Sequence, residues 1–124
     1  MTSSIAPVVG CTDVTLVPEW FRDVLGFNLD PNLVFVLDED DGASYAILDR
    51  DGMNVHLQIR RRPIAHEDNT YDFYASVPDA AALLKEFEGR GVKVVQPLED
   101  QPYGMRDFSV ENPEGGRIMF GSAI

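Results

Sequence analysis

The sequence predicts an α+β domain made of two copies of one βαβββ unit. Residues 45–57 and 108–120, which are 63 positions apart, each hold an apolar run, a turn with glycine and a second apolar run. Asp13 and Asp79, which are 66 positions apart, each open an amphipathic segment. Strand-like alternation of apolar and polar residues surrounds both segments. A repeat of about half the chain indicates two copies of one supersecondary unit.

The length of the chain sets the expected domain count. At 124 residues we expect one domain, 1–124. Within it, module 1 covers about 4–60, a polar connector covers 61–70, and module 2 covers about 71–124. Neither module is large enough to bury a core alone, so we expect the two to pack together or to pair with another chain.

Module 1 is expected to begin with a strand over 4–11, where small and apolar residues alternate. Thr12 or Asp13 can cap the helix that follows. Pro18 suits a first helical turn, so the regular helix is expected over 18–25, and Gly26 ends it. Three strands and two turns should follow: strands at 32–37, 43–48 and 54–60, turns at 38–42 and 50–52.

Module 2 restarts at Tyr71 with a strand over 71–77. A helix is expected over 79–90, because its apolar residues fall on one helical stripe. Three strands should complete the module: 92–95, 105–110 and 117–121.

Alternation also predicts which face of each sheet meets the helices. The uniformly apolar side should pack beneath them, and we expect these residues to be buried: Leu57, Ile59, Leu83, Phe87, Ile118 and Phe120. The other side mixes small, polar and aromatic residues: Ala6, Val8, His56, Gln58, Asp72, Tyr74 and Met119. Such a mixture is typical of a sheet surface that faces a ligand.

Composition excludes some partners. The net charge of −11 and the pI of about 4.3 argue against nucleic acid, because phosphate binding needs a basic face. The same charge could attract a cationic ligand or simply keep the protein dispersed. No apolar run is long enough to span a bilayer, and no secretory signal is expected at the N-terminus, so no membrane partner is predicted. The single cysteine, Cys11, can form no internal disulfide, which suits a reducing cytoplasm. Its place in a strand pattern predicts that it is buried.

Two motifs resemble those of a known family. Residues 20–27, WFRDVLGF, resemble the helix ending of the vicinal oxygen chelate superfamily, which contains glyoxalase I, extradiol dioxygenases, fosfomycin-resistance enzymes and bleomycin-resistance proteins. Residues 103–115, YGMRDFSVENPEG, resemble a segment of its bleomycin-resistance-like branch. The resemblance implies the glyoxalase/bleomycin resistance fold, in which two βαβββ modules form a cup-shaped mixed sheet around a ligand with the helices outside. It also implies a homodimer.

The resemblance further implies where a metal would bind. The superfamily's metal enzymes place His or Gln, Glu, His and Glu on the first and last strands of the modules. The matching positions in this chain are Ala6, His56, Asp72 and Met119. Alanine cannot ligate, and a thioether is a poor ligand for hard divalent ions. Because a catalytic zinc site normally needs three protein ligands, we expect no metal and no cofactor.

The predicted ligand-binding residues follow from the same face. They are His56, Gln58, Asp72, Tyr74 and Met119, with Tyr103 or Arg106 at the rim. His56 and Asp72 could form a carboxylate-oriented general base, but a polar contact to ligand or water is the favoured interpretation. Trp20 could stack on a ligand, although its place on the helix stripe favours core packing. The run Arg60-Arg61-Arg62 is interpreted as a solvated connector.

Two classes of function remain open, and no catalytic residue is identified. The first is a metal-free protein that sequesters an aromatic or cationic small molecule, as bleomycin-resistance proteins do. The second is a glyoxalase- or dioxygenase-type enzyme with an altered metal site or a His56/Asp72 general base. A scaffold without a ligand is a third interpretation. A metal analysis of protein purified without chelators would separate the first two.

Overall fold

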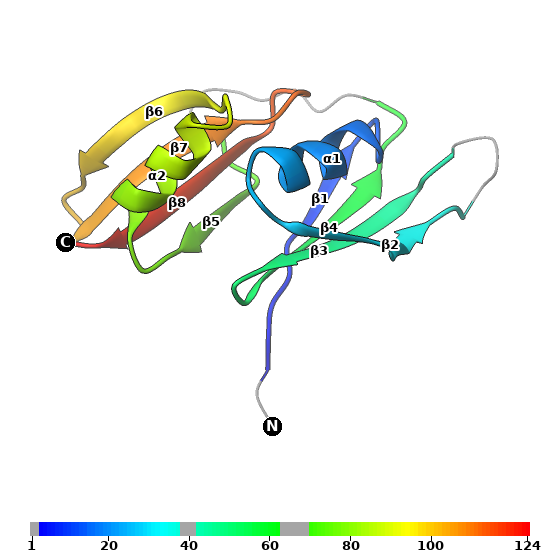
Figure 1. Cartoon of the computed structure of the whole chain (residues 1–124), viewed down its shortest axis with the longest axis horizontal. Helices are drawn as coiled ribbons and strands as arrows, with labels where there is room; N and C mark the ends of the chain where they lie inside the picture. The colour runs from blue at the N-terminus through cyan, green and yellow to red at the C-terminus, as the bar shows by residue number, and fades with distance from the viewer. Residues whose placement is uncertain (1–2, 38–41, 63–69) are drawn as a thin grey trace. The chain divides into compact units, whose positions relative to one another are not determined.

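The computed structural model describes residues 3–37, 42–62 and 70–124. The chain divides into two compact units, Met1–Ala65 (unit 1) and His66–Ile124 (unit 2). Each unit holds one helix and one four-stranded sheet (Figure 1). Most of the predicted 38–42 turn and of the 61–70 connector lies outside the described residues. Within the described residues, no helix has the length and apolar character needed to cross a membrane.

Unit 1 has the predicted βαβββ order. Its elements are β1 (Val8–Cys11), α1 (Leu16–Asp23), β2 (Asn28–Phe35), β3 (Tyr45–Arg50) and β4 (Met53–Ile59). The strands lie in the order β1-β4-β3-β2, in which β1 runs parallel to β4 and the other neighbours are antiparallel.

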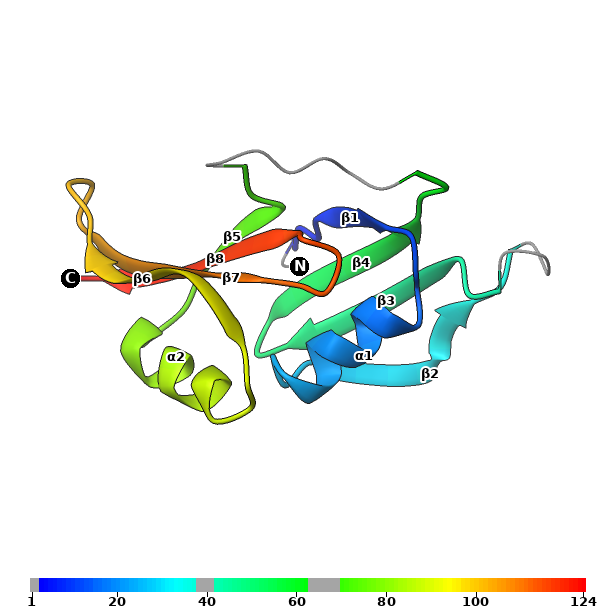
Figure 2. The ribbon, with the colours of Figure 1, turned by 90° about the horizontal axis from the view of Figure 1, so that it is seen from above.

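Unit 2 repeats this order and topology. Its elements are β5 (Phe73–Ser76), α2 (Ala80–Glu88), β6 (Lys93–Asp100), β7 (Met105–Glu111) and β8 (Arg117–Ala123). The strand order is β5-β8-β7-β6, again with one parallel pair, β5 and β8. Figure 2 shows one helix beside one sheet in each unit. The predicted α+β fold class and the repeated unit are confirmed.

The two helices end in the same way. Gly26 follows α1 and Gly91 follows α2, and both take positive φ, at 71° and 81°. This left-handed turn lets Phe27 N–H donate to the carbonyl of Phe21, at 3.0 Å, and Val92 N–H donate to that of Phe87, at 3.2 Å. The prediction that Gly26 ends the first helix is confirmed, and glycine is favoured there because it has no Cβ to clash.

The start of the first helix differs from the prediction. The helix begins at Leu16, two residues before Pro18. Asp13 makes this possible because its carboxylate accepts hydrogen bonds from the backbone N–H groups of Thr15 and Leu16, both at 2.9 Å. These bonds hold the pKa of Asp13 below its usual value. Of the two residues expected to cap, it is therefore Asp13 that binds the helix start.

The core of each unit lies between its helix and its sheet. In unit 2, the ring of Phe87 on α2 meets the rings of Phe108 and Phe120 edge-on. Leu57, Phe87, Ile118 and Phe120 are fully buried, as predicted, and so is Cys11. Trp20 is half-buried, with its ring edge-on to Phe21.

The predicted burial of Ile59 and Leu83 was wrong, because both side chains are only half-buried. Ile59 is the last residue of β4, and Leu83 lies on a helix of nine residues.

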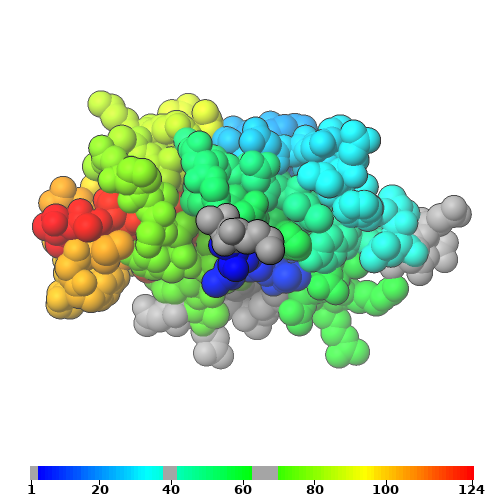
Figure 3. Space-filling view, turned by 90° about the horizontal axis from the view of Figure 1, so that it is seen from below, coloured from blue at the N-terminus to red at the C-terminus, as the bar shows by residue number. Residues whose placement is uncertain are grey.

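The edge strands β2 and β6 are longer than predicted. β2 begins at Asn28 instead of 32, and β6 continues to Asp100 instead of 95. Each contains a proline, Pro31 or Pro97, and each has an irregular register beside it. Proline is tolerated because an edge strand has one side without ladder hydrogen bonds. In Figure 3, atoms of β2, in cyan, lie at the surface of unit 1.

The β3–β4 and β7–β8 hairpins differ in strand register by one residue, because their turns differ in length. The first closes through Asp51 and Gly52, both at positive φ, as the predicted 50–52 turn requires. In the second, the side chain of Asn112 accepts hydrogen bonds from the backbone of Glu114 and Gly116. Ile47 lies opposite His56, whereas Ser109 lies opposite Met119. The offset of 63 therefore holds for β4 and β8, but β3 and β7 align with an offset of 62, which corrects the sequence alignment.

Candidate functional site

Each sheet has one face against the helix of its own unit, and we call the opposite one its distal face. In β4, the buried residues Val55 and Leu57 alternate with His56 and Gln58. In β8, the fully buried Phe120, which packs on α2, alternates with Met119. The predicted assignment of these side chains to faces is therefore correct.

The distal face of unit 1 holds a pair of hydrogen-bonded aromatic side chains. The hydroxyl of Tyr45 on β3 lies 2.7 Å from Nδ1 of His56 on β4. Their rings meet edge-on with centroids 5.4 Å apart. The sequence reasoning did not select Tyr45, although its alternation with the buried Ala46 and Leu48 places it on this face. The imidazole is thus oriented by a phenol.

On the distal face of unit 2, four residues form a row across the strands. Tyr74 on β5 lies opposite Met119 on β8, which lies opposite Ser109 on β7, which lies opposite Gln96 on β6. The Ser109 hydroxyl is buried and has no hydrogen-bond partner among the described residues. Few buried polar groups in folded proteins are in that state.

Asp107 on β7 is the centre of the polar contacts on this face. Its carboxylate is inaccessible to solvent. Gln96 and Gln101 donate to it through their amide nitrogens, both at 3.0 Å, and Tyr74 donates through its hydroxyl at 3.3 Å. The Tyr103 hydroxyl also donates to it. Four uncharged donors thus offset the cost of burying this carboxylate.

These bonds keep both phenols neutral. The hydrogen bond to Asp107, together with burial, raises the pKa of Tyr103 to about 12. Burial, followed by the negative charge of Asp107, raises the pKa of Tyr74. The tyrosine side chains nevertheless remain accessible, with exposed fractions of 42% for Tyr74 and 59% for Tyr103. Each ring is therefore held by its hydroxyl end, while much of its surface is left uncovered.

Gly121 provides the space that Tyr74 occupies. A Cβ on Gly121 would overlap the Tyr74 hydroxyl and lie 2.7 Å from Cζ of the same ring. Gly121 lies opposite Asp107 on the neighbouring strand, so the ring crosses the glycine to reach the carboxylate. Sequence reasoning treated this glycine only as part of the alternation.

Two predicted site residues lie away from this cluster. Arg106 lies opposite Ser122, on the α2 side of β7, and forms an ion pair with Asp100 at 2.6 Å. Its placement at the rim is therefore corrected. The carboxylate of Asp72 lies against the Asn112–Gly116 turn, because a Cβ on Gly116 would come within 2.6 Å of Oδ2 of Asp72. The structure thus brings together Tyr74, Tyr103 and Met119 in unit 2, and His56 and Gln58 in unit 1.

The sequence reasoning missed Gln96, Gln101, Ser109 and Asp107. A signal for two of them was present, because Asp107 and Ser109 alternate with the apolar Phe108 and Val110. The two glutamines lie in and after β6, beyond the residues predicted to form that strand.

The donor set does not fit a metal centre. Residues 3–37, 42–62 and 70–124 contain no group of three His, Cys, Asp or Glu side chains that could hold a metal ion. In unit 1, Nδ1 of His56 is already in contact with a phenol. We therefore derive no chemical step through a metal.

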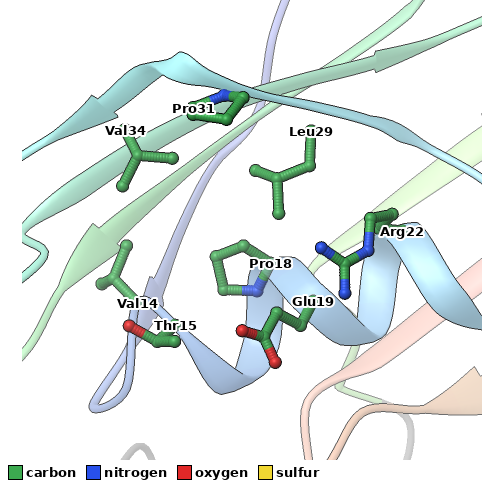
Figure 4. A pocket seen from close by; sticks show the side chains of 8 residues that line it. All are labelled: Val14, Thr15, Pro18, Glu19, Arg22, Leu29, Pro31 and Val34. Carbon is green, nitrogen blue, oxygen red and sulfur yellow. The ribbon is translucent and has the colours of Figure 1, made fainter.

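A separate groove lies between α1 and β2 on the helix side of unit 1 (Figure 4). It has a volume of about 370 Å³ and lies beside the register irregularity of β2 between Leu29 and Val34. Its lining residues are Val14, Thr15, Pro18, Glu19, Arg22, Leu29, Pro31 and Val34. None of them belongs to a distal face, so we treat the groove as distinct from the candidate site.

Comparison with known proteins gives one family and many similar folds. A profile of the Glyoxalase/Bleomycin resistance protein/Dioxygenase superfamily matches residues 7–120. TioX from Micromonospora sp. ML1 is 25% identical, with a TM-score of 0.77 over 99% of this chain and 100% of that one. A bleomycin-binding protein from Streptomyces verticillus, solved with copper(II)-bleomycin, is 24% identical, with a TM-score of 0.77 over 100% and 98%.

A glyoxalase-related enzyme from Clostridium phytofermentans is 18% identical, with a TM-score of 0.78 over 100% of this chain and 97% of that one. No curated protein matches the chain. Binding proteins and enzymes thus share this fold, so the fold alone does not decide between them.

Proposed function

We propose, from the premise that the chain belongs to the Glyoxalase/Bleomycin resistance protein/Dioxygenase superfamily, that it is a metal-free small-molecule-binding protein. The observation that carries the proposal is the pair of tyrosines on Asp107. Both hydroxyls donate to one buried carboxylate, while the side chains stay partly exposed. Ligand-binding surfaces typically combine apolar ring faces with a few fixed polar groups.

The arrangement favours an aromatic ligand. The hydroxyl groups of Tyr74 and Tyr103 already donate to Asp107. A ligand ring can therefore stack on either tyrosine without breaking a hydrogen bond between its hydroxyl and water. Such ring pairs contribute about 0.5–1.5 kcal/mol beyond the apolar area they bury. A cationic ligand is supported only by the net charge of −11, which acts at long range. Asp107 is a poor partner for a cation because four donors already bind it.

The physiological role we infer is sequestration. The bleomycin-binding protein with the same fold holds a small molecule, copper(II)-bleomycin. We extend only the class of activity, the capture of a small molecule, to this chain. We also propose a homodimer, by analogy with the superfamily, and a location in the cytoplasm, because a chain with one cysteine forms no internal disulfide.

A glyoxalase- or dioxygenase-type enzyme is the alternative. The carboxylate-oriented base expected from His56 and Asp72 needs a carboxylate on one ring nitrogen, and the contact at Nδ1 is the Tyr45 phenol. We therefore place the binding function first.

The test is a titration of the wild type, Tyr74→Ala and Tyr103→Ala against a panel of aromatic small molecules. Loss of a stacking ring should cost about 1 kcal/mol, which is about a fivefold rise in Kd. Leu16→Ala is the control, because Leu16 lies on α1 with a similar exposed fraction, 47%. Hits that bind all four proteins equally would remove the proposed site.

A further inference from the structure

The side chain of Arg60 lies across Gly10 on the distal face of unit 1. A Cβ on Gly10 would overlap Cδ of Arg60 and lie 2.6 Å from its Cγ. The backbone holds Arg60 in place, because its N–H donates to the carbonyl of Cys11 at 2.8 Å, directly after the end of β4. Glycine at position 10 therefore makes room for this arginine.

Arg60 continues a line of nitrogen donors. His56, Gln58 and Arg60 alternate along one strand, and Gln58 lies opposite both Gly10 and Tyr45. Gln58 and Arg60 are exposed. The guanidinium and the amide thus offer N–H groups on the same surface as the Tyr45–His56 pair.

Arg60 differs from most of the other arginines, which pair with a carboxylate. The protein has 21 acidic and 10 basic residues. Arg22, Arg50, Arg90, Arg106 and Arg117 each lie within ion-pair distance of a carboxylate. No ion pair joins Arg60 to any residue in the described part of the chain. In so acidic a protein, a guanidinium that is seated over a glycine and forms no ion pair within the described residues is available to a ligand.

We propose that Arg60 binds the anionic group of the ligand, a carboxylate or a phosphate ester attached to an aromatic ring. A guanidinium can donate two parallel hydrogen bonds to either group, which lysine cannot do with the same geometry. This inference rests on the proposed function, because it names the class of small molecule that the protein binds. It concerns the distal face of unit 1 alone, where the rings of Tyr45 and His56 lie beside this strand. It replaces the expectation that the run at 60–62 is only a solvated connector.

The experiment uses three matched probes on the full chain: 2-naphthoate, 2-naphthyl phosphate and the neutral 2-naphthamide. Binding is followed by amide chemical shifts in the wild type, Arg60→Gln, Gly10→Ala and the control Arg62→Gln. Arg62→Gln removes the same charge beyond the end of β4. We expect Arg60→Gln to weaken an anionic probe about tenfold or more and to leave naphthamide unchanged.

Gly10→Ala should have the same selective effect, because it moves the guanidinium while keeping its charge. The spectrum of each variant shows whether it is folded. The two anionic probes decide between carboxylate and phosphate, according to which one loses more affinity in Arg60→Gln. If all three probes bind the wild type alike and Arg60→Gln changes none of them, the anion inference is wrong and the aromatic-binding proposal stands. If no probe binds the wild type, both are rejected.

Discussion

Asp107 shows how one residue can organise a surface. Its carboxylate is fully buried, yet its four donors are amides and phenols instead of a cation. They come from β5, from β6 and from the turn between β6 and β7. Removing the carboxylate would leave all four donors without their acceptor.

Asp107→Ala should therefore lower the free energy of unfolding by about 2 kcal/mol or more, since hydrogen bonds to charged groups are stronger than neutral ones. Urea unfolding measures the change. Asp100→Ala is the control, because its ion pair with Arg106 is exposed and should matter much less. Equal effects of the two substitutions would show that the Asp107 contacts stabilise the fold no more than an exposed ion pair does.

Tyr103 should titrate separately from an unperturbed tyrosine. Its pKa of about 12 lies above the ordinary value of 10.0, mainly because its hydroxyl donates to Asp107. A raised pKa in the folded state gives stability that is present below pH 10 and lost as the pH rises to about 12. Ultraviolet absorbance should show a tyrosinate step near pH 12 that disappears in Tyr103→Phe and moves to lower pH in Asp107→Asn. A step that persists in Tyr103→Phe would contradict this assignment.

At the level of the elements, the parallel pair β5 and β8 contains a glycine that gives space to a tyrosine ring. Tyr74 on β5 reaches Asp107 only by crossing Gly121 on β8. The equivalent pair in unit 1 is β1 and β4. Its glycine, Gly10, lies on the first strand of the unit and gives space to the side chain of Arg60. Each unit thus seats one long side chain over a glycine of its parallel strand pair.

Gly121→Ala should displace Tyr74 from Asp107 without removing either residue. We expect weaker binding of aromatic probes, by about the same factor as for Tyr74→Ala, because the added methyl group occupies the position of the phenol. The double variant Gly121→Ala/Tyr74→Ala is the control and should bind no more weakly than either single variant. Additive losses would mean that Gly121 acts through some other contact.

At the level of the whole molecule, the two units share a topology and differ in the chemistry of their distal faces. Tyr45 in unit 1 occupies the position of Asp107 in unit 2, and His56 occupies that of Met119. In both units, apolar residues that face the helix stabilise the same fold. The residues on the opposite side of each strand can therefore differ between the units.

Exposed apolar side chains in unit 1 support the proposed dimer. Four of them follow one another in and just after the edge strand β2: Leu33, Phe35, Val36 and Leu37, of which Leu37 has an exposed fraction of 78%. Exposed apolar side chains that gather on one edge often mark a protein interface. Sedimentation equilibrium should give twice the chain mass of 13.8 kDa, and Leu37→Asp should shift the protein toward the monomer. A wild type that sediments at the chain mass over a wide concentration range would contradict the dimer.

Local patterns predicted the two βαβββ units, the caps and glycine ends of the helices, and the faces of the last strands. They succeeded because helix and strand periods directly set which side chains meet the core. They failed to give the full length of β2 and β6, which contain Pro31 and Pro97. Proline is unfavourable in a central strand, but it is tolerated in these two because they lie at the edges of their sheets. They also offered Arg106 as a residue of the site rim, because nothing in its neighbours along the chain identified Asp100 as its partner.

The candidate site was predicted only in part for a related reason. Alternation by itself determined that His56, Gln58, Tyr74 and Met119 lie on distal faces. Only the tertiary structure decided that Tyr74 and Tyr103 share Asp107, and that Gly10 and Gly121 give space to Arg60 and Tyr74. These contacts join residues between 4 and 50 positions apart. Periodicity determines the direction in which a side chain leaves its strand, whereas strand pairing and turn length determine what it meets.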